Sequence, residues 1–478
     1  MRSFQISCLT VLLAACGARH PLPEPTEPLV STARGALPAT PPALGADEDA
    51  SLPTVRHIRL ETGLTVRHVH QEGWPTTTVY LVSARGGEVY PRTEAGLSRL
   101  SNWSLARTAS GLLEGIVVAS RVNGEASSLG ATVLPEQVAG LLAALGRVVT
   151  DASPPDEVIE DIRIAQLNSM RDYQRSSGGA ARMTSLENLY GSRHHLAGSP
   201  WGDVDVVADT SPADVRAAAA GRWSPSSSAL VVVGDIDPQT LDSLAAESFA
   251  SFVDRPGQSP SIPRPQDRPS RSVMAFHDGG EAADIVLSDR GPRIDADDSL
   301  AFQALMVLAG GHFSSRINQS LRVQHTLTYG AHAGYKASRF AGTYSLELTV
   351  PNDAVEETLE ILEEQLHGLH QTPPTSAELA RVKRLLESSL RAALDDNSRT
   401  ASRIAYGWVR GQPRDLFTER MAAIRALTSE QLHAAALEWV RPGEVPIVVA
   451  GDLNTIKPRR NLDQFGDVRI FTFQFEDD

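Results

Sequence analysis

Apolar residues in the first half of the chain follow the spacing of strands and helices. Residues 57–69 alternate in polarity and turn at Thr62-Gly63, and residues 76–84 continue the alternation, which predicts strands. Residues 229–234 form a continuous apolar run typical of a buried strand. Helical spacing is clearest in residues 134–149, at Val138, Leu141, Leu142, Leu145 and Val148. Helices are also expected over residues 94–110, 155–173 and 211–221.

The second half of the chain repeats this order of elements. Helices are expected over residues 298–309, 314–323, 353–370, 376–395 and 429–439, and strands over residues 342–350 and 446–450. Two markers, Gly234 with Gly451 and Ser98-Arg99 with Ser315-Arg316, share one spacing of 217 residues (451 − 234 and 315 − 98). One spacing for two independent markers indicates a duplication. We therefore predict an α+β fold of two tandem homologous halves, each a mixed β-sheet with helices packed on it.

Proline clusters suggest where the domains begin and end. Residues 17–55 and 254–272 are rich in proline, which interrupts helices and strands, so both segments are predicted as linkers. The linkers leave an N-terminal domain over residues 56–253 and a C-terminal domain over residues 273–478.

The first 16 residues have the features of a targeting segment. Arg2 precedes a short apolar run, and Leu13-Ala14-Ala15-Cys16 resembles a bacterial lipobox. We expect Cys16 to be lipidated, and the alternative is an ordinary signal peptide cut after the small residues. Gly17 after the cysteine favours the periplasmic face of the outer membrane. The sequence therefore predicts a lipid-anchored protein of the cell envelope, in contact with the membrane through the lipid only.

Composition excludes several classes of function. The 478 residues carry a formal net charge of −14, which argues against nucleic-acid binding because phosphate contacts need clustered Lys and Arg. The two cysteines, Cys8 and Cys16, both lie in the targeting segment. A disulfide framework and a thiolate metal site in the rest of the chain are therefore excluded.

A series of short strings runs through residues 56–457 in a fixed order. They are Thr62-Gly63-Leu64-Thr65-Val66, Gly86-Gly87-Glu88, Glu94-Ala95-Gly96-Leu97, Leu189-Tyr190-Gly191, Val233-Gly234-Asp235, Leu308-Ala309-Gly310-Gly311, Ser314-Ser315-Arg316, Leu321-Arg322 and Leu327-Thr328-Tyr329-Gly330. Each string alone is weak, but in this order and at these separations the chain resembles the insulinase/pitrilysin-like metallopeptidases, which include mitochondrial processing peptidase. The resemblance implies that the two halves form half of a clam-shell chamber.

The zinc motif of that family is changed in this chain. Active members carry His-x-x-Glu-His, in which two histidines on one helix face hold zinc and the glutamate activates the zinc-bound water. The corresponding positions here are Arg99, Asn102 and Trp103. A third ligand, a glutamate in the family, falls at Asn168 or one of its neighbours. Arginine and tryptophan cannot replace histidine as ligands, and asparagine is no general base, so no metal is expected in this chain.

The other histidines do not suggest a relocated metal site. His68 and His70 lie two apart in a predicted strand, and we interpret them as surface residues. His194 and His195 suggest a loop role. His367 and His370 lie three apart in a predicted helix and are interpreted as surface residues too. A hydrolase with a relocated site is thus the least favoured hypothesis.

A second feature of the family is retained. Its members pair an arginine and a tyrosine on a helix end and on the following strand of the C-terminal half, and Arg322 and Tyr329 match these positions. The resemblance implies that the pair binds the substrate backbone near the scissile carbonyl, where a guanidinium and a phenol suit a developing oxyanion. The structural alternative is that Arg322 caps the helix and Tyr329 fills the sheet.

The changed zinc motif and the retained arginine and tyrosine together favour one function over another. Some members of the family work as pairs in which one chain carries zinc and the other supplies Arg and Tyr. The leading hypothesis is therefore a non-catalytic subunit of a heterodimeric zinc peptidase, which binds extended peptides and needs a zinc-bearing paralogous partner. The alternative is a catalytically inert peptide-binding or scaffolding lipoprotein of the cell envelope.

Overall fold

The computed structural model describes residues 52–86, 92–192, 194, 196–197, 199–255, 266–277, 279–413, 415–459 and 462–471. The expected lipidation site Cys16, nearly all of the predicted linker 17–55 and residues 256–265 of the second predicted linker lie outside the described residues. Residues 52–478 form one compact unit by their contacts. Within the described part of this unit, no helix is long and apolar enough to cross a membrane.

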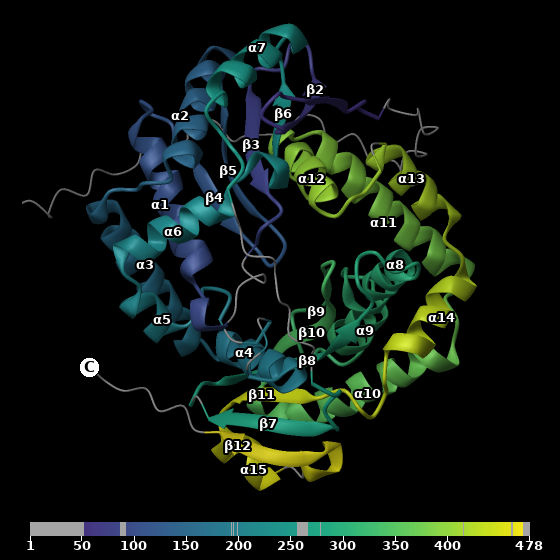
Figure 1. Cartoon of the computed structure of the whole chain (residues 1–478). Helices are drawn as coiled ribbons and strands as arrows, with labels where there is room; N and C mark the ends of the chain where they lie inside the picture. Colours follow the sequence, from purple (N-terminus) through teal and green to yellow (C-terminus); the bar gives the residue numbers. More distant parts are fainter. Residues whose placement is uncertain are drawn as a thin grey trace, which may run out of the picture. The chain divides into compact units, whose positions relative to one another are not determined.

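Two six-stranded sheets with equivalent strand orders form the framework (Figure 1). The first sheet has the order β1 (Arg56–Arg59), β2 (Thr65–His70), β6 (Ser228–Gly234), β3 (Thr77–Ser83), β5 (Ser127–Val133) and β4 (Ala119–Val122). The second has the order β12 (Asp467–Phe471), β7 (Ser272–His277), β11 (Ile447–Gly451), β8 (Ala282–Gly291), β10 (Gly342–Pro351) and β9 (Ala331–Ala337).

In each sheet, a strand from late in the half is inserted between two early strands: β6 lies between β2 and β3, and β11 lies between β7 and β8. β6 is parallel to β2 and antiparallel to β3, and β11 is likewise parallel to β7 and antiparallel to β8. The sheets are therefore mixed, and the predicted α+β fold of two homologous halves is confirmed. The edges differ, because β1 pairs antiparallel with β2 whereas β12 pairs parallel with β7.

The paired glycines of the sequence repeat end the two inserted strands. A Cβ on Gly234 would lie 2.6 Å from the Cα of Thr77, and a Cβ on Gly451 would lie 2.7 Å from the Cβ of Ala283. Both positions therefore need glycine, because the neighbouring strand approaches too closely for a side chain. This close approach gives a physical reason for the marker that revealed the repeat.

Six helices of the first half cover the first sheet. They are α1 (Leu97–Gly111), α2 (Val138–Asp151), α3 (Asp156–Arg175), α5 (Val204–Asp209), α6 (Pro212–Arg222) and α7 (Pro238–Ser248). α1 and α2 pack on the strands of the sheet, and the other four pack on these or neighbouring helices. The apolar residues predicted to form one face of α2 are buried, and they pack in a cluster with strand residues such as Leu81 and Val232. A capping box between Ser211 and Asp214 begins α6, as the sequence of that segment leads one to expect.

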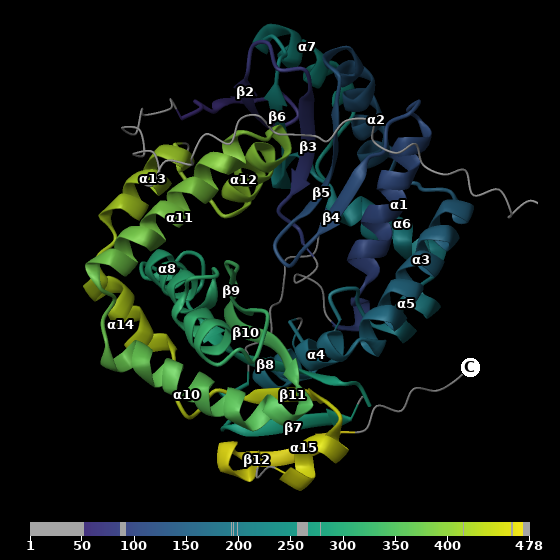
Figure 2. The ribbon, with the colours of Figure 1, turned by 180° about the vertical axis from the view of Figure 1, so that it is seen from behind.

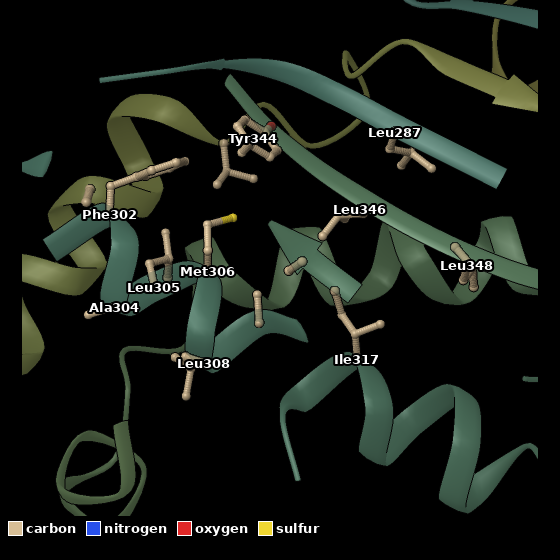
Figure 3. Packing of buried hydrophobic residues seen from close by; sticks show 14 of the residues in the cluster. Leu287, Phe302, Ala304, Leu305, Met306, Leu308, Ile317, Tyr344, Leu346 and Leu348 are labelled. Atoms are coloured by element: carbon tan, nitrogen blue, oxygen red, sulfur yellow. The ribbon is translucent and has the colours of Figure 1, made fainter. Parts of the chain in front are cut away.

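Helices of the second half enclose the second sheet and a larger core. They are α8 (Ser299–Gly310), α9 (Arg316–Asn318), α10 (Val355–Gln371), α11 (Ser376–Leu394), α13 (Leu416–Ala426), α14 (Ser429–Trp439) and α15 (Leu453–Arg459). Figure 3 shows Phe302, Leu305 and Met306 of α8 packed with Tyr344 and Leu346 of β10. The predicted helix 314–323 is only partly α-helical, since α9 continues as a π-helical segment over Gln319–Gln324.

Two helices are exchanged between the halves. α4 (Ser177–Tyr190) belongs to the first half but packs on β8 and β11, whereas α12 (Asn397–Val409) belongs to the second half but packs on β3 and β6 (Figures 1 and 2). The hydroxyl of Tyr190 lies 2.6 Å from that of Thr343, and the hydroxyl of Tyr80 lies 2.7 Å from that of Ser398. Each half therefore completes the other's core, which couples the two sheets.

Candidate functional site

A cavity of about 1730 Å³ lies between the halves, within residues 52–478. The first half contributes the beginning of α1, the β4–β5 hairpin and part of α4 to its walls. The second half contributes β9, β10, α12 and α13. Arg99 lines this cavity, whereas Arg322 and Tyr329 are not among the described residues around it. The two predicted groups of site residues are therefore not brought together within one chain.

Arg99 is held in the cavity wall by a carbonyl and two indole rings. Its Nη2 donates to the carbonyl oxygen of Pro200 over 2.9 Å. The guanidinium carbon lies 4.5 Å from the ring centre of Trp201 and 5.5 Å from that of Trp103. Burial lowers the pKa of the Arg99 guanidinium, although arginine remains charged in proteins. A fixed cation thus occupies the position at which the family motif has its first histidine.

Asn102 is fully buried and ties α1 to the sheet. Its Nδ2 donates to Ser120 Oγ over 2.7 Å and to the carbonyl oxygen of Ser128 over 3.1 Å. Ser120 belongs to β4 and Ser128 belongs to β5. This amide therefore anchors the helix, and an amide does not take up a proton at neutral pH as a general base must.

The α3 residue nearest the start of α1 is Gln166 rather than Asn168. Asn168 is exposed, while Gln166 is fully buried and donates from Nε2 to the carbonyl oxygens of Gly96 (3.1 Å) and Trp201 (2.7 Å). Residues 99, 102, 103 and 166 thus supply a guanidinium, two amides and an indole. These groups do not fit a zinc ion, which takes imidazole, thiolate or carboxylate ligands. Among the described residues, no group of three or more His, Cys, Asp or Glu residues is placed to hold a metal ion.

Arg322 and Tyr329 are exposed residues of the second half. Arg322 is in the π-helical segment, with its guanidinium carbon 4.5 Å from the ring centre of Phe313. Tyr329 is 97% exposed and lies in the turn before β9, not in the strand that the family pattern implies. The exposure of Tyr329 argues against the alternative in which this ring fills the sheet.

Charged pairs across the cavity join the two halves. Glu125, in the turn between β4 and β5, accepts hydrogen bonds from Nε of Arg410 over 2.8 Å and from the backbone N–H of Arg339 over 2.6 Å. Its side chain is only 3% exposed. Arg182 of α4 donates to Glu347 of β10 over 2.6 Å. Both contacts hold elements from opposite halves in one arrangement.

The interpretation of His68 as a surface residue is wrong. The residue is 1% exposed, and neither ring nitrogen has a hydrogen-bond partner among the residues that the structure describes. Four consecutive residues of β2 are buried, so both faces of the sheet are covered here and the strand shows no alternation. Burial, together with the nearby charges of His70 and Arg56, lowers the pKa of His68 to about 4.

Acid should destabilise the fold through His68. The pKa is near 6.5 in the unfolded chain and about 4 in the fold, so the unfolded chain binds more protons between these values. The contribution of neutral His68 to the free energy of unfolding is therefore fully present above pH 6.5. It is lost as the pH drops toward 4, by at most about 3 kcal/mol. Unfolding in urea at several pH values measures this slope. His68→Gln should flatten it, while the exposed His367→Gln should not, and equal slopes in all three proteins would contradict the role of His68.

The chain folds as two tandem α+β halves, and Arg99, Asn102 and Trp103 stand at the positions of the family zinc motif. Residues 209–386 match the family model described as the Peptidase M16 inactive domain. This match includes Arg322 and Tyr329 and leaves out α1. The match confirms, over residues 209–386, the resemblance to the insulinase/pitrilysin-like (M16) peptidases that the short strings predicted.

Known proteins similar to this chain carry different names. An uncharacterized zinc protease of Mycobacterium tuberculosis is 23% identical over 285 residues, which are 59% of this chain and 64% of that protein, so the match spans less than two thirds of the relative. A crystal structure of a peptidase M16 inactive domain from Pseudomonas fluorescens superimposes with a TM-score of 0.74 at 20% identity, covering 83% of this chain and 98% of that one. A chain of Complex III2 from Candida albicans gives 0.73 at 16% identity, covering 86% and 98%. The two structures show a shared fold.

Proposed function

We propose that this chain is a non-catalytic subunit of a heterodimeric zinc peptidase. It binds an extended peptide and supplies Arg322 and Tyr329 to the active site of a zinc-bearing paralogous partner. The observation that carries the proposal lies in α1 and α3. There the side chains of Arg99, Asn102 and Gln166 donate hydrogen bonds to neighbouring protein groups. These residues leave no group that could hold zinc or activate water.

The surface position of the Arg/Tyr pair supports action on another chain. A phenol that is 97% exposed and a guanidinium beside the exposed Phe313 are accessible to a second molecule. Arg322 and Tyr329 lie outside the cavity of their own chain, so a site in their own α1 would gain nothing from them. In a partner's site, two fixed donors would stabilise the oxyanion that forms as the peptide bond is attacked.

The cavity supports the binding of a peptide. Its volume of about 1730 Å³ exceeds that of most small-molecule sites, and its walls combine charged, aromatic and apolar residues. An extended chain offers alternating backbone donors and acceptors, which such polar walls can satisfy. The lipid on Cys16 would hold the subunit at the periplasmic face of the outer membrane, and incorporation of labelled palmitate that is lost in Cys16→Ser tests this.

The second candidate is a catalytically inert lipoprotein that binds peptides or serves as a scaffold. The similarity to a chain of Complex III2 favours it, because that chain belongs to a large assembly. The mycobacterial relative is named a zinc protease. In this chain, however, the residues at the positions of the zinc motif include Asn102, which is engaged in hydrogen bonds to the sheet.

Reconstitution separates the two candidates. The proteins that copurify with the full chain are identified first. The full chain is then expressed with and without any zinc-bearing paralogue found among them, and cleavage of a quenched fluorescent peptide is followed. The proposal predicts no cleavage by this chain alone and faster cleavage by the mixture than by the paralogue alone. A paralogue that is equally active without this chain, or the lack of any zinc-bearing protein among the copurified chains, favours the scaffold.

A further inference from the structure

Two arginines of the second half face the cavity at neighbouring positions. Arg403 lies on α12 and Arg420 on α13, and both line the cavity. They are close enough that the positive charge of Arg403 lowers the pKa of Arg420. Tyr335 of β9 and Gln303 of α8 lie beside them in the same wall. Four elements of the second half therefore converge on a small region of positive charge.

These two guanidinium groups differ from the arginines of the cavity that form ion pairs. Arg182 and Arg410 each form an ion pair with a buried or half-buried glutamate. Arg420 instead donates to the neutral side chain of Gln303, and no ion pair of Arg403 or Arg420 is found in the described part of the chain. Their charges are accessible from the cavity and not neutralised.

Arg403 is exposed and Arg420 is partly buried in the cavity wall, and partial desolvation lowers the pKa of both guanidinium groups. Desolvation is the largest cause that lowers the pKa of Arg403 and that of Arg420, and no carboxylate opposes it for either residue. Glu419 precedes Arg420 and also lines the cavity, but adjacent residues of a helix do not face each other. Two partly desolvated cations side by side destabilise the empty cavity, and an anion between them would relieve this.

We propose that Arg403 and Arg420 form a subsite that binds a carboxylate of the peptide in the cavity. A guanidinium presents parallel donors that match the two oxygens of a carboxylate, and the hydrogen bonds are strong because both partners are charged. The subsite is selective because the chain as a whole is acidic, with a net charge of −14, and repels anions elsewhere. It rests on the proposed function, in which the cavity takes up a peptide.

A carboxylate can come from the C-terminus of the peptide or from an Asp or Glu side chain. Four fluorescein-labelled peptides of one sequence distinguish these sources: with a free or an amidated C-terminus, and with Glu or Gln at one internal position. Their affinities for the full chain are measured by fluorescence anisotropy. The variants are Arg403→Gln, Arg420→Gln and the charge reversal Arg403→Glu. The control is Arg399→Gln, an exposed arginine on the same helix that does not line the cavity.

The wild-type chain and the control should bind the peptide carrying the recognised carboxylate about tenfold more tightly than its neutral counterpart. Arg403→Gln and Arg420→Gln should lose this preference and still bind the neutral peptide as before, which also shows that they are folded. Arg403→Glu should reverse the preference. Equal affinity of the wild-type chain for all four peptides would overturn the subsite alone, and an unchanged preference in the variants would do the same. Binding of none of the peptides would remove the proposed peptide binding together with the subsite.

Discussion

Replacing Arg322 with alanine lowers the turnover number of the reconstituted two-chain peptidase by about 10²–10³-fold, the usual cost of losing one oxyanion donor. Tyr329→Phe, which removes only the hydroxyl, has an effect of the same kind. The Michaelis constant changes little, because both donors act on charge that develops in the transition state. Steady-state cleavage of the fluorescent peptide at saturating partner concentration gives both constants.

Because the two residues are exposed, their substitution should change turnover without disturbing the fold. Tyr329 is 97% exposed, and Arg322 contacts the exposed Phe313. Neither substitution therefore opens a cavity in the core. Gln324→Ala, an exposed change in the same π-helical segment, is the matched control and should leave turnover intact. Gel filtration of the mixture shows whether assembly is retained. Full turnover of both variants in an intact complex would defeat the assigned role.

Replacing Glu125 with alanine should destabilise the fold by roughly 3 kcal/mol. The carboxylate is 3% exposed and binds the side chain of Arg410 and the backbone of Arg339, which both come from the other half. Its removal leaves guanidinium groups and an N–H group without their acceptor in a partly buried place. The midpoint of thermal unfolding should fall by several degrees.

Matched variants show whether the loss arises from this contact. Glu136→Ala changes an exposed glutamate before α2 and should leave the midpoint within experimental error. Glu125→Ala combined with Arg410→Ala should be less destabilised than the sum of the single changes, since the two residues share one interaction. Additive effects would mean that the ion pair does not couple the halves.

Much of the fold could be predicted because the repeat and the apolar spacing are local features. The face of α2 and the strand ends at Gly234 and Gly451 carry their signals in a few neighbouring residues. The exchanged helix α4 carries a weaker signal. α4 opens with Gly178, Gly179, Ala180 and Ala181, small residues that suit close packing on the second sheet and conceal the helical period.

The candidate site was predictable at α1 and less so elsewhere. The motif spacing identifies residues 99, 102 and 103, but the partners of Arg99 are Pro200 and Trp201, which lie about a hundred residues further on. Gln166 and Asn168 are two residues apart on opposite sides of α3, one buried and one exposed, so counting from the motif could not distinguish them. Arg403 and Arg420 carry no local pattern, because only the tertiary fold brings α12 and α13 to one wall of the cavity.

The zinc content of the purified chain tests the central claim most directly. The untagged full chain is incubated with excess zinc, passed through gel filtration and analysed by mass spectrometry of the metal. We predict far less than one zinc per chain, because a guanidinium, two amides and an indole stand where imidazoles and carboxylates would be needed. One tightly held zinc ion per chain would contradict the account.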